Sequence, residues 1–148
     1  MIYQLIKNFR ILWVTLAIVG CAGAPKVSDT RPDFYGKFVE EENLKTVDRI
    51  FPFRYRGWTP LDERYMIVNL TANRAFLLRF KISCLDATME QQVAIRTINN
   101  MYVPARDPIT FIGSRQGPCF ADKIYPLTKE QSLEVRKRKE FRDKVKDS

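Results

Sequence analysis

The sequence predicts a single domain of the α+β or mainly β class, with one antiparallel sheet of about five strands, open or curled into a small barrel, followed by a C-terminal helix. The chain has 148 residues, which is room for one domain rather than two. Residues 34–127 are rich in aromatic and β-branched residues broken by turn signals, a composition typical of strands. Residues 128–148 are highly charged and begin with a helix-capping pattern.

Residues 1–20 have the pattern of an export signal. Lys7 and Arg10 come first, and an uncharged apolar run follows from 11 to 20. That run is about half of the ~20 apolar residues that a membrane-spanning helix needs, and it fits the hydrophobic region of a secretion signal. We therefore expect residues 1–20 to be a signal peptide that is removed on export.

The residues after the apolar run indicate the type of signal. Ile18, Val19 and Gly20 lead directly into Cys21, an order that resembles the lipobox of bacterial lipoproteins. In that pattern the cysteine thiol accepts a diacylglyceryl group, and the small residue before it admits the signal peptidase, so Cys21 becomes the lipid-bearing first residue. Two or three acyl chains give stable anchoring at a membrane surface. The alternative is a signal anchor with a coincidental cysteine.

Residues 21–33 are expected to form the lipid anchor and a tether. Ala22 follows the cysteine, and the lack of an aspartate there resembles the default sorting of Gram-negative lipoproteins to the outer membrane. The stretch holds proline, glycine, serine and charges without an apolar period, which is typical of a linker. We therefore expect a bacterial cell-envelope protein, lipid-anchored in the outer membrane and facing the periplasm.

Two cysteines remain after export, Cys84 and Cys119, which are 35 residues apart. Thiols rarely stay free in an oxidising compartment, and only one intramolecular pairing exists. The prediction is a structural disulfide that stabilises the fold by roughly 3–4 kcal/mol. A redox pair and an intermolecular bridge are the alternatives, although the chain has no close C-x-x-C arrangement of the kind that tunes a reactive thiol.

The folded region begins with weaker signals. Residues 38–50 allow a helical turn, and residues 51–56 alternate aromatic with other side chains. Pro52 cannot donate to a central ladder, so 51–56 is expected to be an edge strand whose aromatic side chains fill the core.

The clearest element is a hairpin of residues 65–70 and 75–80. If residues 72–73 form its loop, Val68 lies opposite Leu77 and both faces of the hairpin are apolar. A pair of strands with two apolar faces belongs in the middle of a layered or closed structure.

A second pair is expected from residues 109–114 and 119–125, joined by a Gly-Pro turn at 115–118. Residues 85–101 stay open between a further strand and a short helix that starts after the first cysteine of the pair.

The charged helix of residues 128–148 starts with a capping box, in which Thr128 is the N-cap and Gln131 reaches back to it. It contains eight basic and five acidic residues, so much of the excess charge is expected there. Its predicted apolar contact stripe is thin. The stripe consists of Leu133, Phe141 and Val145.

The charge of the whole chain points to anionic partners. The net charge is +8, and removal of the two basic residues of the signal leaves +6. Such a charge favours anionic lipid headgroups or phosphate-bearing envelope polymers, while a solvated helix face is the alternative explanation. We expect a non-enzymatic binding or structural module, with binding of anionic envelope polymers or lipids through a basic surface as the second function.

No catalytic residue, cofactor or metal site is expected. The chain has no histidine, which removes the usual general base near neutral pH and the commonest metal ligand. The candidate acids and nucleophile do not form a recognisable pair or motif. They are Asp62, Glu63, Asp86, Asp107 and Ser114.

The predicted partner surface, for an envelope protein or an anionic polymer, consists of Trp58, Arg54 and Arg56. Aromatic side chains interleaved with arginines resemble a platform for single-stranded nucleic acid, but an exported protein does not meet that partner, so no nucleic acid is expected. A buried Trp58 that bonds a neighbour is the alternative to an exposed one beside Arg56 and Asp62.

A set of motifs adds a resemblance. It consists of GWTPLDE at 57–63, AFLL at 75–78, Cys84, Gly117-Pro118-Cys119 and Ile124. In this order they resemble a family of small, uncharacterised proteobacterial lipoproteins classified as a domain of unknown function. The resemblance covers roughly residues 50–127. It implies export, lipidation and a disulfide, and it supplies no activity and no catalytic residue.

Overall fold

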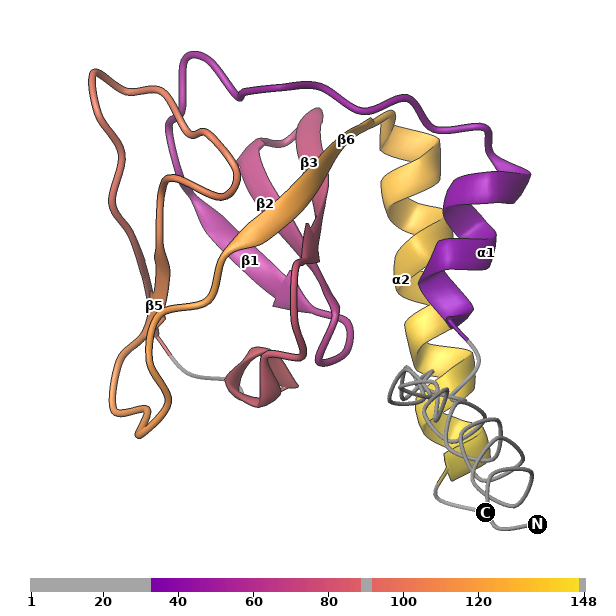
Figure 1. Cartoon of the computed structure of the whole chain (residues 1–148). Coiled ribbons are helices and arrows are strands. Elements are labelled where there is room, and N and C mark those ends of the chain that lie inside the picture. Colours follow the sequence, from indigo (N-terminus) through magenta and orange to yellow (C-terminus); the bar gives the residue numbers. More distant parts are fainter. Residues whose placement is uncertain (1–32, 89–91, 147–148) are drawn as a thin grey trace, which may run out of the picture. The chain divides into compact units, whose positions relative to one another are not determined.

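The computed structural model describes residues 33–88 and 92–146 (Figure 1). The predicted signal of 1–20, the lipidation site Cys21 and the tether up to residue 32 lie outside the described residues.

The described residues form two antiparallel sheets, two α-helices and one short 3₁₀ helix (Figure 1). The larger sheet has the order β1-β2-β3-β6, with β1 Gly57–Pro60, β2 Tyr65–Thr71, β3 Arg74–Phe80 and β6 Ala121–Leu127. The smaller sheet pairs β4 Val93–Ile95 with β5 Ile109–Phe111. The helices are α1 Phe34–Glu41, the short 3₁₀ helix η1 Leu85–Thr88 and α2 Lys129–Lys146. The α+β class and the C-terminal helix are confirmed, and the described strands form open sheets rather than a closed barrel.

The central hairpin β2–β3 is apolar on both faces, as the sequence predicts. One face packs with the helices in a core that contains Tyr35, Ile67, Leu77 and Val135. The other face packs toward the smaller sheet and its loops in a second core. The second core includes Val68, Phe76, Leu78, Tyr102 and Ile109. A strand pair covered on both sides needs apolar residues at successive positions instead of an alternating pattern.

The register of the hairpin differs from the expected one because β2 carries a bulge. The turn closes as predicted, but Leu70 has no partner in the ladder and the register shifts there by one residue. The expected pairing of Val68 with Leu77 is therefore wrong, since Val68 lies opposite Phe76. A one-residue shift exchanges the faces, and here it places Val68 and Phe76 in the same core.

The predicted pairing of 109–114 with 119–125 is also wrong. β6 pairs with β3, and β5 pairs with β4, while Ile109 meets Cys119 only in an isolated bridge. The physical reason is burial, because Ile124 and Tyr125 of β6 contribute to the two different cores and so need cover on both faces. Residues 85–101 contain both of the predicted alternatives, since the helical turn η1 and the strand β4 lie in this segment.

Residues 51–56 form a loop instead of the predicted edge strand, and β1 and β6 are the two edges of the larger sheet. Of the three aromatic side chains in this loop, Phe53 enters the core and Phe51 and Tyr55 are exposed. The Phe51–Pro52 peptide is cis.

Helix α1 has a defined start and stop. Asp33 is its N-cap, and its carboxylate accepts a hydrogen bond of 2.7 Å from the Gly36 amide. At the other end Asn43 adopts a positive φ, and the Leu44 amide bonds back to the Val39 carbonyl. These bonds form a Schellman motif, which satisfies carbonyls that the helix leaves unpaired.

Helix α2 packs through a different face from the predicted one. Leu133, Phe141 and Val145 are exposed, so the expected contact stripe is wrong. Val135 is the buried apolar residue of the helix, and Arg138 and Arg142 lie on the same side. This face was missed because it is built from arginine side chains, whose aliphatic stems and planar groups cover apolar and aromatic surface.

Candidate functional site

The arginines of α2 are used inside the fold. Arg138 pairs with Glu41 of α1 at 2.7 Å, and its guanidinium lies 5.0 Å from the centre of the Phe38 ring. Arg142 lies 5.3 Å from the centre of the Tyr35 ring. Because Tyr35 and Phe38 lie near the start and middle of α1, these contacts show that the two helices run antiparallel. We call α1, α2 and the sheet face beneath them the helix layer.

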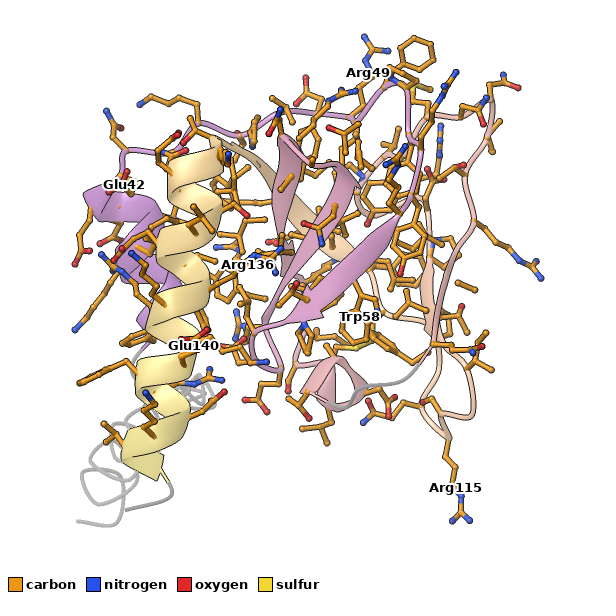
Figure 2. The ribbon with its side chains drawn as sticks, turned by 180° about the vertical axis from the view of Figure 1, so that it is seen from behind. Glu42, Arg49, Trp58, Arg115, Arg136 and Glu140 are labelled. Atoms are coloured by element: carbon orange, nitrogen blue, oxygen red, sulfur yellow. A yellow bond between two sulfur atoms is a disulfide. The ribbon has the colours of Figure 1, made fainter. Side chains whose placement is uncertain are left out.

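A second group of arginines lies on the other side of the sheet, on the loop 49–56 and at the start of β3. We call it the arginine–aromatic surface. Its members are Arg49, Phe51, Arg54, Tyr55, Arg56 and Arg74. Arg74 joins it because its guanidinium donates to the Phe51 carbonyl at 2.8 Å. Figure 2 shows Arg49 at the top of the molecule, with α2 along the left.

The loop that carries this surface is held by its neighbours. Phe53 is buried and stacks on Tyr102, with ring centres 5.4 Å apart, and on Tyr55 at 6.4 Å. The Phe53 amide donates to the Asn100 carbonyl, and Ile50 bridges to Tyr102. Partial burial raises the pKa of Tyr55, so its hydroxyl stays protonated across physiological pH. The exposed side chains therefore project from a backbone fixed to the core.

The charge on the arginine–aromatic surface is not neutralised. Within 33–88 and 92–146, no carboxylate lies within ion-pair distance of its four arginines. Arg49 contacts only the Met101 sulfur, at 3.9 Å, and Arg54 and Arg56 make no side-chain hydrogen bond in the described structure. Exposed aromatic side chains, Phe51 at 62% and Tyr55 at 37%, lie between these cations. The guanidinium groups of such a surface can bind the anionic groups of a ligand, and its aromatic side chains can pack against apolar or ring-shaped parts of the same ligand.

The predicted partner residues divide into two groups. Arg54 and Arg56 are exposed on the arginine–aromatic surface, as expected for a ligand surface. Trp58 is half-buried in β1, where it packs edge-on against Phe111 with ring centres 5.4 Å apart. Asp62 does not lie beside it, because its carboxylate faces Arg142 of the helix layer. Trp58 therefore packs against the core and the smaller sheet instead of standing exposed as a ligand contact.

The predicted partner residues left out four members of the surface, which are Arg49, Phe51, Tyr55 and Arg74. The first three lie in or just before the run 51–56, so its alternation of aromatic and arginine side chains could have indicated them. Arg74 is 18 positions beyond Arg56, and only the folded hairpin brings its guanidinium to Phe51.

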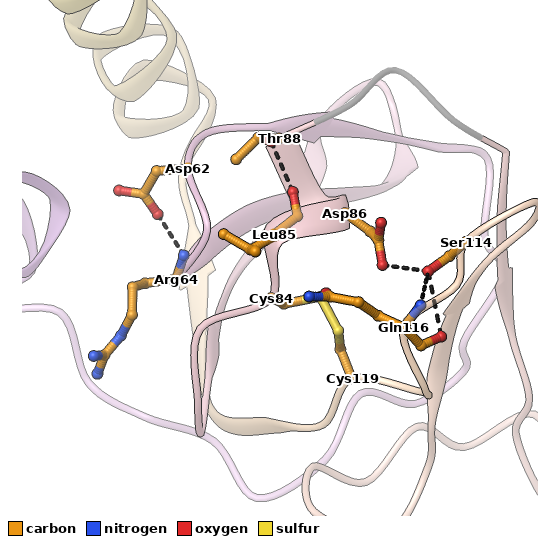
Figure 3. The surroundings of a disulfide bond; sticks show 9 residues. All are labelled: Asp62, Arg64, Cys84, Leu85, Asp86, Thr88, Ser114, Gln116 and Cys119. Atoms are coloured by element: carbon orange, nitrogen blue, oxygen red, sulfur yellow. Dashed lines mark hydrogen bonds between the residues drawn. A yellow bond between two sulfur atoms is a disulfide. The ribbon is translucent and has the colours of Figure 1, made fainter.

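The structure contains the Cys84–Cys119 disulfide, with Cα atoms 6.1 Å apart (Figure 3). It connects the segment before η1 to the loop before β6. Beside it the Ser114 hydroxyl donates to the buried carboxylate of Asp86, a contact that the sequence separation concealed. The same hydroxyl accepts a 2.8 Å bond from the Gln116 amide, so Ser114 closes the loop next to the disulfide.

Asp62 and Asp107 each have a structural task. Burial raises the pKa of Asp62, although the amides of Arg64 and Tyr65 that it accepts at 2.7 and 2.8 Å lower it in part. Burial also raises the pKa of Asp107, but hydrogen bonds from Arg106 and the Val103 amide outweigh burial and hold that pKa below its usual value. Both carboxylates are occupied by backbone and arginine donors.

A groove of about 300 Å³ lies between the β2–β3 turn, the end of β6 and the first turns of α2. Its lining includes Asn69, Asn73, Ser132 and Arg136. Arg136 already donates to Thr59 at 2.8 Å and to Asn69 at 2.9 Å, so its guanidinium joins α2 to β1 and β2.

In the part of the chain that the structure describes, no three acidic, cysteine or histidine side chains lie close enough together to hold a metal ion. No helix of the described residues is both long and apolar enough to cross a bilayer.

Comparison with known proteins gives one match. Residues 5–142 match the model of a family of unknown function, DUF6491. No curated protein and no solved structure matches the chain. The match covers every described strand and α2 up to residue 142, and it attaches no activity to the arginine–aromatic surface.

Proposed function

The chain belongs to DUF6491, a family of unknown function, and we propose that it is a lipid-anchored, non-enzymatic binding protein of the bacterial cell envelope that holds a phosphate-bearing anionic polymer. The arginine–aromatic surface is the binding surface in this proposal. The observation that carries it is the set of four arginines without a carboxylate partner among the described residues, on a loop fixed to the core.

The anchor in this proposal is the acylated Cys21. Its support is the lipobox-like order of residues 18–21 after an uncharged apolar run, together with the resemblance to small proteobacterial lipoproteins. Ala22 favours sorting to the outer membrane, where the domain would face the periplasm. In the same compartment, oxidising conditions favour the Cys84–Cys119 disulfide.

Arginine suits this role for a chemical reason. Its planar guanidinium donates two parallel hydrogen bonds to phosphate and keeps its charge at every physiological pH. Several such groups around exposed aromatic side chains can follow a repeating anionic chain without a deep pocket. The proposal therefore predicts modest affinity that depends strongly on salt.

The test uses the mature protein with inorganic polyphosphate as the probe. The Arg49→Gln, Arg54→Gln and Arg56→Gln triple variant should bind about tenfold to a hundredfold more weakly, since three exposed charge contacts contribute roughly 0.5–1 kcal/mol each. The matched control replaces Lys81, Arg115 and Lys123 with glutamine, which removes the same charge from exposed positions elsewhere. Figure 2 shows Arg115 at the far end of the molecule from Arg49.

Equal weakening of both triple variants would assign the binding to net charge and would contradict a defined surface. The anchor has its own test, because Cys21→Ser should abolish acyl labelling and retention in the membrane fraction. A Cys21→Ser protein that keeps its acyl label would contradict the assignment of the anchor.

A further inference from the structure

The C-terminal half of α2 carries an exposed apolar face. Phe141 is 66% exposed and Val145 is 61% exposed, and they lie one helical turn apart on the same side. Lys137 precedes Phe141 by one turn, and Lys137 and Lys144 are both exposed beside this pair. We call Lys137, Phe141, Lys144 and Val145 the distal face of α2. A phenylalanine and a valine flanked by lysines match the composition of helices that lie at a lipid interface.

The described chain begins next to this face. Tyr35, in the first turn of α1, contacts Arg142, and the later α1 residue Glu41 contacts Arg138. The N-terminal end of α1 therefore lies beside the distal half of α2, and the N-cap Asp33 lies at that end. Figure 1 shows the two helices side by side, with the first residues of α1 next to the later turns of α2.

The anchor proposed at Cys21 is 12 residues before Asp33. Fully extended, that length of chain spans at most about 40 Å. The end of the domain that holds the distal face is thus the end from which the connection to the bilayer leaves. Arg49 of the arginine–aromatic surface lies toward the other end, since Figure 2 shows it at the top of the molecule and Glu140 below the middle of α2.

From this geometry we infer that the distal face of α2 rests on an anionic lipid bilayer, with Phe141 and Val145 in the headgroup region and Lys137 and Lys144 near lipid phosphates. The inference rests on the proposed lipid anchor at Cys21. It gives the domain an orientation: the helix layer lies toward the bilayer, and the arginine–aromatic surface points away from it. A bound polymer would then be held at a distance from the membrane that carries the anchor.

The test measures tryptophan quenching in the full lipidated protein, reconstituted in vesicles of phosphatidylglycerol and phosphatidylcholine with brominated acyl chains. A Phe141→Trp variant should lose several-fold more of its added emission than a Leu133→Trp variant, with the parent protein as the reference. Leu133 is a matched control because it is also exposed on α2, about 12 Å nearer the start of the helix. In vesicles of phosphatidylcholine alone the quenching should fall, because the lysines lose their anionic partners.

The outcomes distinguish failure of the lipid contact of the distal face from failure of the proposed anchor at Cys21. If the protein is acylated and floats with the vesicles but the two variants are quenched alike, the distal face does not touch lipid and the inference is overturned while the anchor stands. Equal quenching in neutral vesicles would overturn the role given to the lysines. A change of emission that depends on protein concentration without vesicles would assign the face to a second copy of the chain. A protein that lacks an acyl group at Cys21 would overturn the anchor itself.

Discussion

Each arginine of α2 in the helix layer has a partner, whereas none of the four arginines on the arginine–aromatic surface has a carboxylate partner among the described residues. In the helix layer Arg138 holds α1 through Glu41, and Arg142 lies over the Tyr35 ring. On the arginine–aromatic surface Arg54 and Arg56 extend into solvent from a loop that Phe53 fixes to the core.

The position of a charged side chain therefore says less about its function than whether an opposite charge pairs with it. By sequence, much of the excess positive charge lies in residues 128–148. In the fold, the three arginines of that helix serve packing, and a group of arginines without carboxylate partners among the described residues lies on residues 49–56 and Arg74.

The largest effect is expected from removing the disulfide. The Cys84→Ala, Cys119→Ala double variant should lose roughly 3–4 kcal/mol of unfolding free energy, measured by urea denaturation, because the link closes a long loop in the unfolded chain. The loss should show first on the side of the smaller sheet, where the disulfide joins the segment before η1 to the loop before β6. Native-state hydrogen exchange should therefore speed up in residues 93–119 before α2. Equal acceleration in α2 would mean that the two regions unfold as one and would weaken the comparison.

A smaller effect on stability should come from truncating one arginine side chain in each region to alanine. Arg142→Ala should destabilise the fold by about 1–2 kcal/mol, since it removes the contact with the Tyr35 ring and leaves the partly buried Asp62 without its cation. Arg54→Ala makes the same truncation at an exposed side chain without a carboxylate partner among the described residues. It should change stability by less than about 0.5 kcal/mol. Thermal and urea unfolding of the two variants checks both values. If Arg54→Ala costs as much as Arg142→Ala, the arginine–aromatic surface is structural and the comparison fails.

The sequence predicts the fold class well because the class depends on local patterns of apolar, turn and capping residues, which can be recognised along the chain. The apolar runs of β2 and β3 indicate a covered hairpin, and the Thr128 capping box indicates the start of α2, where the Gln131 side chain accepts from the Thr128 amide at 3.0 Å. The pairing of strands was harder, because the bulge at Leu70 and the partner of β6 depend on which core each side chain fills.

The candidate site could be predicted in part for a related reason. Arg54 and Arg56 stand in an obvious run, but whether an arginine is free depends on distant carboxylates. Arg138 binds Glu41, which is 97 positions away, and Arg74 binds Phe51, which is 23 positions away. Whether either arginine is paired can therefore not be predicted from the spacing of residues in the sequence. Trp58 is a conspicuous residue in the sequence and was predicted to belong to the partner surface, but in the fold it is half-buried against Phe111.

The smallest effect concerns two buried tyrosines of the helix layer. The Tyr65 hydroxyl donates to the Asp33 carboxylate at 3.1 Å, whereas the Tyr35 hydroxyl is buried with no hydrogen-bond partner among the described residues. Tyr65→Phe should cost about 1 kcal/mol at neutral pH, and Tyr35→Phe should be neutral or stabilise the fold by up to about 1 kcal/mol, because it removes an unpaired buried polar group. Urea denaturation at pH 7 distinguishes the two, and each variant is the size-matched control of the other.

The same pair of variants has a second signature at alkaline pH. Burial raises the pKa of Tyr35 and of Tyr65, so both stay protonated in the folded state at a pH where an unfolded tyrosine ionises. Their contribution to stability is therefore complete below about pH 10 and is lost as the pH rises from there toward the folded-state pKa, by about 1.4 kcal/mol per pH unit for each tyrosine. Both phenylalanine variants should reduce this alkaline slope by the same amount, although only Tyr65→Phe loses stability at pH 7. A slope that changes in one variant alone would mean that the other tyrosine ionises in the folded state, which would contradict the closed packing of the helix layer against the sheet.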